Sequence, residues 1–228
     1  ARMNGCELPV IINSGSGNQG ITVSVPVVVY ARELGSSKEQ LYRALAFNLT
    51  AIHQKPIGRL SAYCGAVSAG AGAGAGIAYL CGGSYKDITH TVVNALAIVS
   101  GIICDGAKAS CAAKIASAID AGILGYHMYK NGQQFHGGDG IVTKGIEATL
   151  QNVGRLGKDG MKETNEEIIR IMLGIADSSS MHPFAHFILS CYNTLKSFAG
   201  AVFIIPGAAQ SSDIPNLITK GTFNEKDL

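Results

Sequence analysis

Two long stretches without a charged side chain limit what this chain can fold into. Residues 60–85 contain no Asp, Glu, Lys or Arg, and Ile88 to Cys104 form a second uncharged run. Glycines recur at every second position in the middle of the first run: Gly70, Gly72, Gly74 and Gly76. Small residues at this spacing let helices approach one another closely. The two runs therefore predict two buried helices whose glycines mark close crossings or the walls of a cavity.

A membrane hairpin is the alternative interpretation of the same two runs, because each is long enough to be weighed as a spanning segment. Gly and Ala contribute little transfer free energy, however, and Ser, Thr, His90 and Asn94 interrupt the runs. We therefore favour helices buried in a soluble core over membrane insertion.

Composition excludes one class of partner and indicates a compartment. The 228 residues carry 18 Lys plus Arg against 16 Asp plus Glu, with no dense basic block that would follow a phosphate backbone, so we expect no nucleic-acid partner. Six cysteines without a signal peptide favour the cytoplasm and free thiols. The chain begins with Ala, and we expect it to be part of something longer.

Amphipathic patterns predict further helices outside the uncharged runs. One begins after a cap at Ser36 or Ser37 and ends before Pro56. A second runs from about Gly140 to Val153, after a loop that includes His127, His136 and Asp139. The segment ETNEEIIRIML predicts a third, capped by Thr164 or Asn165. By contrast, the β-branched stretch from Ile21 to Leu34 has the local pattern of a strand.

Three cysteines lie among small residues: Cys64 in GRLSAYCGAV, and Cys104 and Cys111 in SGIICDGAKASCAAK. Seven residues of continuous helix rise about 10.5 Å, which is long for two thiolates that meet one small centre. We therefore expect Asp105-Gly106 to break the backbone and a new helix to begin near Ser110, where its first turn favours the Cys111 thiolate. We interpret the three as metal ligands. The alternative is a small buried hydrophobe, which is how we interpret Cys6, Cys81 and Cys191.

A loop rich in Gly, Ser and Asn, Ser14 to Gly20, separates two apolar runs near the start of the chain. Successive Gly and Ser residues permit the mixed dihedral angles of an anion-binding nest, and a following helix would add its N-terminal amides. The spacing matches neither a Walker loop nor a dinucleotide fingerprint, so an ordinary flexible loop is an equal alternative.

Taken in order, these motifs resemble a known family. The loop SGSGNQG followed by VPVVV, then GRLSAYCGAV with its Gly/Ala tract, then GIICDGAKASCAAK, are similar to bacterial and archaeal L-cysteine desulfidases, which are related to the alpha domain of iron–sulfur L-serine dehydratases. The similarity covers about residues 1–173 and leaves 174–228 as an atypical tail without an assigned role. It implies a mainly α catalytic domain with Gly-rich loops, and we therefore expect Ile21 to Leu34 to be a helix.

The resemblance also implies a site and a reaction. A 4Fe-4S cluster would be held by Cys64, Cys104 and Cys111, with one iron open to substrate and no pyridoxal phosphate. The implied reaction is α,β-elimination on L-cysteine to pyruvate, ammonia and sulfide. Our candidates for holding the substrate carboxylate are the loop residues and, as a weaker one, an arginine: Ser14, Ser16, Gly17, Asn18, Gln19 and Arg59.

Other functions remain open at this point. Serine dehydration on the same scaffold is the nearest alternative, and a non-catalytic fragment whose cysteines hold zinc or nothing is a more distant one. Proteins of this family have an additional N-terminal half, so we expect that half or a second copy of the chain as a partner. The general base is unassigned.

Overall fold

The structure is a computed structural model that describes residues 1–46, 57 and 61–175. These residues belong to one compact unit, Ala1–Ala176, which is mainly helical and, within the described ranges, contains no strand. Its helices in chain order are α1 (Gly17–Glu33), α2 (Lys38–Ala46), α3 (Gly65–Leu80), α4 (Tyr85–Val99), α5 (Cys111–Lys130), α6 (Ile146–Arg155) and α7 (Lys162–Met172), with a short 3-10 turn at Arg2–Asn4 and a π-helical turn at Leu156–Gly160. The mainly α fold predicted from the sequence is confirmed.

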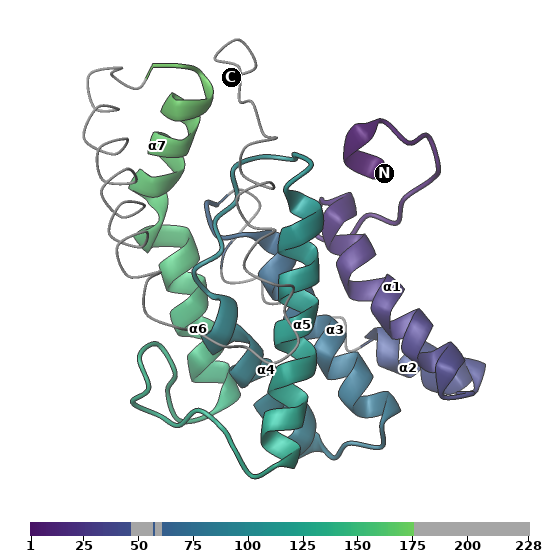
Figure 1. Cartoon of the computed structure of the whole chain (residues 1–228). Coiled ribbons are helices and arrows are strands. Elements are labelled where there is room, and N and C mark those ends of the chain that lie inside the picture. Colours follow the sequence, from purple (N-terminus) through teal and green to yellow (C-terminus); the bar gives the residue numbers. More distant parts are fainter. Residues whose placement is uncertain (47–56, 58–60, 176–228) are drawn as a thin grey trace, which may run out of the picture. The chain divides into compact units, whose positions relative to one another are not determined.

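Helix α3 lies at the centre and contacts α1, α2, α4 and α5 (Figure 1). The glycines of α3 allow its neighbours to approach closely. A Cβ at Gly74, for example, would stand only 2.8 Å from Gly122 Cα on α5. Nearly the whole helix is buried, from Ala66 to Ala78. The buried helices predicted from the two uncharged runs are thus present as α3 and α4. No helix in the described part of the chain is long and apolar enough to cross a membrane.

Helices α1, α3 and α5 run in the same direction. Along α3, Gly70 meets Ala118 and Gly74 meets Gly122, so the order of contacts rises together on α3 and α5. The same holds against α1, where Gly65 meets Gln19 and Gly76 meets Val27. The N-terminal ends of all three helices consequently lie at one end of the unit.

Helix α4 follows α3 after a tight turn and begins with a capping box. The Ser84 hydroxyl accepts a hydrogen bond from the Asp87 amide, and the Asp87 carboxylate accepts one from the Ser84 amide. Further along, the buried Asn94 side chain joins two other segments, since Nδ2 donates to the Gly125 carbonyl at 3.0 Å and Oδ1 accepts from the Phe135 amide at 3.1 Å. These contacts fix the C-terminal end of α5 and the loop that follows it.

Helix α1 occupies the stretch whose local pattern resembles a strand. The helix expected from the family resemblance is confirmed, and the local strand pattern is misleading. Val23, Val27 and Ala31 are buried, whereas Val25 and Val29, which a strand would place on the same face, are exposed; a helix satisfies this pattern and a strand does not. Pro26 stands inside the helix, where its missing N–H leaves one backbone hydrogen bond unmade.

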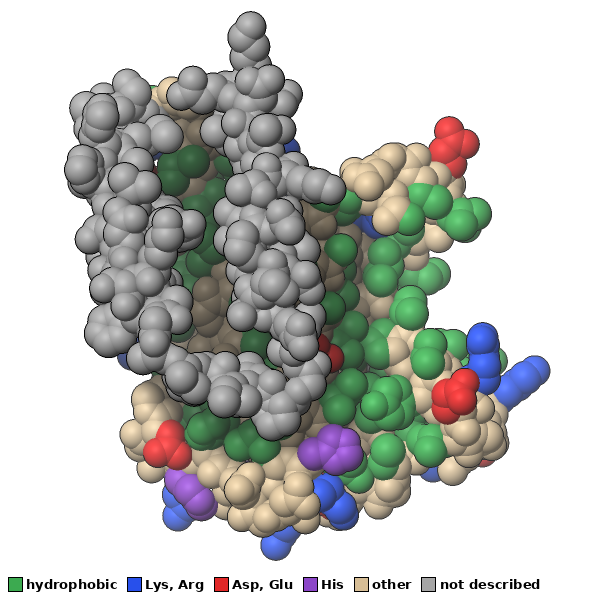
Figure 2. All heavy atoms as spheres, in the orientation of Figure 1, with side chains coloured by type: hydrophobic (Ala, Val, Ile, Leu, Met, Phe, Trp, Pro, Cys, Tyr) green, Lys and Arg blue, Asp and Glu red, His purple; other side chains and the backbone are tan. Residues whose placement is uncertain are grey.

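Several large hydrophobic side chains on and before α1 are exposed. Figure 2 shows hydrophobic side chains along the α1 side of the face in view. The exposed set is Leu8, Ile11, Ile12, Val25, Val29 and Leu34. Hydrophobic patches of this kind mark surfaces that other chain segments or partners cover.

Helices α6 and α7 begin at other residues than predicted, whereas the predicted N-terminal cap of α2 is present. Helix α6 begins at Ile146 rather than near Gly140, because Gly140 and Gly145 both have positive φ, at 61° and 94°. Helix α7 begins at Lys162, so Thr164 lies inside it and caps nothing; the π-helical turn leads into α7 and replaces a cap. At α2, Ser37 and Gln40 form the expected reciprocal cap.

His127 is also placed differently from the prediction, since it belongs to the last turn of α5 and not to the loop. His136 and Asp139 do lie in that loop, where the Asp139 carboxylate accepts the His136 amide at 2.6 Å. Their role is therefore at least partly to shape the turn.

Candidate functional site: three helix N-termini and three thiols

Two of the three candidate cysteines stand at helix N-termini. Cys64 is the residue immediately before α3, and Cys111 is the first residue of α5. The first amides of a helix have no partner within it and carry the positive end of the helix dipole. Because α1, α3 and α5 are parallel, three such ends gather in one place, which favours anions and thiolates there.

An isolated antiparallel bridge brings the third cysteine to the first. Tyr63 pairs with Ile103, the Cys64 amide donates to the Ile102 carbonyl at 3.1 Å, and the Cys104 amide donates to the Ala62 carbonyl at 2.7 Å. Side chains alternate between the two faces of such a pair, so Cys64 and Cys104 share one face as diagonal neighbours. Tyr63 and Ile103 occupy the other face.

The segment from Cys104 to Cys111 is not helical and a new helix begins beside Ser110, as the sequence predicts, although α4 already ends at Val99. Gly106 has φ of 90°, and the Cys111 thiol lies 3.5 Å from the Gly106 carbonyl. Lys114, one turn into α5, ties this segment to the helix. Its ammonium donates to the Ile103 carbonyl at 3.1 Å and forms an ion pair with Asp105.

Electrostatics show that the three thiols and Lys114 act on one another. Burial raises the pKa of Cys64; a hydrogen bond with the Ala66 amide lowers that pKa, Cys104 and Cys111 raise it, and Lys114 lowers it. Burial lowers the pKa of Lys114, but Asp105 and the thiols of Cys64 and Cys111 raise it more. Lys114 thus opposes the effect of burial at Cys64, but burial is the larger effect and leaves the pKa of that thiol raised.

The three thiols are of the ligand type that iron–sulfur clusters use. In the described ranges, no three side chains of His, Cys, Asp or Glu are arranged to hold one metal ion. A cubane cluster keeps its thiolate ligands farther apart than one ion does, and thiolates are the ligands that iron–sulfur clusters use. Three thiols from three segments, on the positive ends of two helices, suit an anionic cluster.

Asn18, from the glycine-rich loop, lies beside a cavity that Cys111 also lines. A cavity of about 450 Å³ is lined by the first residues of the chain, the start of α1 and the start of α5, and includes Arg2, Asn18 and Cys111. The Arg2 guanidinium donates to Asn18 Oδ1 at 2.6 Å. A cation and an amide side chain therefore lie beside one of the candidate cluster thiols.

The loop residues have different roles from one another. Ser14 and Gly15 adopt positive φ, and the Ser16 hydroxyl caps α1 by accepting the Gln19 amide at 3.4 Å. The Asn18 amide has no hydrogen-bond partner among the described residues and Asn18 lines the cavity, whereas Gly17 is buried beside the Arg2 guanidinium and does not line it.

Gln19 does not line that cavity; its side chain is buried against Gly65, and its Oε1 has no partner in the described part of the chain. Arg59 and Cys191 lie outside the described residues. Cys6 and Cys81 are exposed free thiols, so their interpretation as small buried hydrophobes is wrong.

Sequence reasoning missed Arg2. Arg2 is sixteen positions before Asn18 and has no motif around it. Only the fold brings the two residues together. The signal available in the sequence was weak: an arginine near a glycine-rich loop, where a carboxylate would need a cation.

This fold and site define a helical domain with a three-thiol centre at converging helix N-termini. The family described as serine dehydratase alpha chain matches residues 1–170, and the chain belongs to that family. It is 69% identical over 180 residues to a UPF0597 protein of Desulfitobacterium hafniense, covering 78% of this chain and 42% of that protein. It is 61% identical over 175 residues to a UPF0597 protein of Lachnoclostridium phytofermentans, covering 76% of this chain and 42% of that one. The chain thus spans about two fifths of these relatives' length. No solved structure matches the chain.

Proposed function

We propose that the chain is the cluster-bearing part of an amino-acid lyase that performs α,β-elimination on L-cysteine. One observation carries the proposal: Asn18, from the glycine-rich loop, and Cys111, a candidate cluster ligand, line the same cavity. A substrate held by the loop would thus have its reacting carbons beside the thiol centre.

Binding of the substrate carboxylate is assigned to the start of α1. The Asn18 backbone amide belongs to the positive helix end, its side-chain amide carries a second donor, and the Arg2 guanidinium stands next to it. These three groups suit a carboxylate because each contributes a donor or positive charge. They orient the substrate without taking part in bond breaking.

Cys64, Cys104 and Cys111 would hold a 4Fe-4S cluster, which supplies a Lewis acid for the departing β-substituent and makes pyridoxal phosphate unnecessary. The chain's own contribution is positive charge beside the thiols. Burial raises the pKa of Cys64, the Lys114 ammonium opposes that shift, and Cys111 begins α5 at the positive end of the helix dipole. The general base is assigned to the part of the longer protein that this chain does not include.

That remaining part is also the partner we propose. The exposed hydrophobic side chains on and before α1, among them Ile11, Val25 and Val29, are a surface that the rest of the protein would cover. The relatives' additional length supports this, since each is more than twice as long as the matched segment.

Serine dehydration on the same scaffold is the second candidate, and the family match favours it. Both reactions need the same carboxylate site and differ in the leaving group. Thiolate leaves more readily than hydroxide, which supports cysteine. Specificity constants for L-cysteine and L-serine, measured anaerobically side by side in the complete protein, decide between the two reactions. We expect sulfide release from cysteine to exceed pyruvate formation from serine. A clear preference for serine would establish the second candidate.

The loop assignment is tested by Gly17→Val. A Cβ at Gly17 would stand 2.7 Å from Arg2 Nε, so the larger side chain displaces the guanidinium from Asn18. We expect the KM for substrate to rise by roughly tenfold or more, in line with the loss of a charge-assisted hydrogen bond, while iron content stays unchanged. An unchanged KM in an iron-replete variant would remove the loop from the substrate site.

A further inference from the structure

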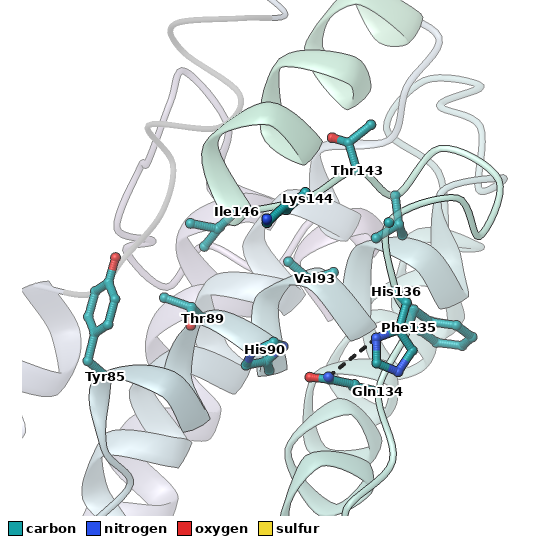
Figure 3. Close-up of a pocket in the computed structure, with 13 residues that line it drawn as sticks. Tyr85, Thr89, His90, Val93, Gln134, Phe135, His136, Thr143, Lys144 and Ile146 are labelled. Carbon is teal, nitrogen blue, oxygen red and sulfur yellow. Dashed lines mark hydrogen bonds between the residues drawn. The ribbon is translucent and has the colours of Figure 1, made fainter.

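A second cavity lies at the other end of α5. It has a volume of about 360 Å³ and is formed by the first half of α4, the loop after α5 and the start of α6 (Figure 3). Twenty residues of α5 separate the two ends, which corresponds to about 30 Å of helix rise. The cavity is therefore separate from the thiol centre, and neither the family match nor the proposed reaction assigns it a role.

Basic side chains surround this cavity. His90, His136 and Lys144 line it, and none of its described lining residues is Asp or Glu. The nearby Asp139 carboxylate is engaged by the His136 amide. Burial lowers the pKa of His90, as do the positive charges of His136 and Lys86, while Asp87 raises it. Since α6 starts at Ile146 without a side-chain cap, its first amides add to a field that favours an anionic group.

The cavity also contains side-chain atoms that lack a partner. In the described part of the chain, five buried side-chain N or O atoms have no hydrogen-bond partner. Two of them, Gln134 Oε1 and Thr143 Oγ1, belong to residues that line the cavity. Thr143 is held by its backbone, which exchanges two hydrogen bonds of 3.1 Å with the Thr149 hydroxyl. Gln134 is half-buried with its Nε2 3.5 Å from His136 Nδ1, and its Oε1 is a buried acceptor that a ligand carrying a donor would satisfy.

The remaining wall is apolar. Val93, Phe135, Val142 and Ile146 line the cavity, and His90 is held in place by stacking on Tyr129, with ring centroids 4.3 Å apart. Figure 3 shows Lys144 and Ile146 on one side of the cavity and His90, Gln134 and His136 on the other. A positive group, an unmet acceptor and an apolar wall thus face one small volume.

We propose that this cavity binds an α-amino acid with an apolar side chain. Its carboxylate lies at Lys144 and the first amides of α6, its ammonium donates to Gln134 Oε1, and its side chain contacts Val93 and Val142. This assignment does not depend on the proposed lyase reaction, because it uses no residue of the thiol centre.

The test is calorimetric titration of the full chain with L-valine, which lacks a β leaving group. We expect saturable binding that Lys144→Gln weakens roughly tenfold, by the loss of a charge-assisted hydrogen bond, and that Gln134→Leu also weakens. The matched control is Lys38→Gln, which removes an exposed charge on α2 and should leave the affinity unchanged. Isovalerate, which lacks the amino group, and isobutylamine, which lacks the carboxylate, should each bind more weakly than L-valine.

Three results would overturn the proposal. Absence of saturable L-valine binding excludes the site, and isovalerate binding as tightly as L-valine excludes the role of Gln134. Loss of binding in Asn18→Ala, with Lys144→Gln unchanged, would place the amino acid in the cavity beside Cys111. That last result would contradict the second site while supporting the proposed lyase site, so the two proposals fail separately.

Discussion

The closest approach of α3 and α5 provides a quantitative test of the packing that assembles the site. At Gly70 an added Cβ would stand 2.5 Å from the Ala118 carbonyl carbon and 2.7 Å from its Cβ. Favourable contact between carbon atoms begins at about 3.5 Å, so Gly70→Ala requires the two helices to separate locally by about 1 Å. Both neighbours belong to a helix backbone or its Cβ, and no rotamer change relieves the overlap.

The cost of this change follows from two opposing contributions. Overpacking a dense core costs about 1–3 kcal/mol, and the rigid backbone at Ala118 favours the upper end of that range. Replacing Gly by Ala inside a helix returns about 1 kcal/mol of helix propensity. We therefore expect a net destabilisation of about 2 kcal/mol, which corresponds to a fall in Tm of about 4–8 °C for a chain of this size.

Thermal unfolding followed by circular dichroism measures the effect. Gly101→Ala is the matched control, because a Cβ there meets no atom within 4 Å and should leave Tm nearly unchanged. The separation of the helices should also lower iron binding, since Cys64 and Cys111 start the two helices that move. A Gly70→Ala variant as stable as the parent would show that α3 and α5 do not pack through this contact.

Two further predictions concern α4. Asn94→Ala removes the side chain that bonds both the Gly125 carbonyl and the Phe135 amide, and we expect a loss of about 2–4 kcal/mol in urea unfolding; a loss below 1 kcal/mol would show that water replaces the side chain. Ser84→Ala should cost about 1 kcal/mol at neutral pH. Hydrogen bonds from Ser84 lower the pKa of Asp87, so the part of this contribution made by the carboxylate is present above about pH 4 and is lost as the pH falls through the folded-state pKa, whereas the bond from the Asp87 amide to the Ser84 hydroxyl remains; a difference between variant and parent that does not shrink below pH 4 would contradict the pairing of Ser84 with the carboxylate.

Local patterns predicted the buried helices well and the ends of helices less well. The absence of charge around Gly70 and Gly74 is a direct consequence of burial, so it could be interpreted without knowing the neighbours. The break at Gly106 was likewise visible, because Asp-Gly after an apolar run is a local turn signal. At α7, by contrast, Thr164 has the sequence of a cap but lies inside a helix that continues from the π-helical turn.

The convergence at the site could not be obtained from local patterns. Cys64 and Cys104 share one face only because of the bridge at Tyr63, and Asn18 reaches Cys111 only because α1 and α5 run in the same direction. Sequence spacing carries no information about either contact. The family resemblance supplied the three cysteines as a set, while the roles of Arg2 and Lys114 come from tertiary structure.

The claim that Cys64, Cys104 and Cys111 form one cluster-binding set is tested most directly by iron and acid-labile sulfide content after anaerobic purification, together with the visible absorption of the cluster. We expect each single Ser substitution in the set to abolish the cluster, because the remaining two thiolates do not anchor it. Cys81→Ser is the matched control: it alters an exposed thiol outside the site and should leave iron, sulfide and absorption intact. Colourless protein with stoichiometric zinc, or a parent and variants with equal iron content, would contradict the account.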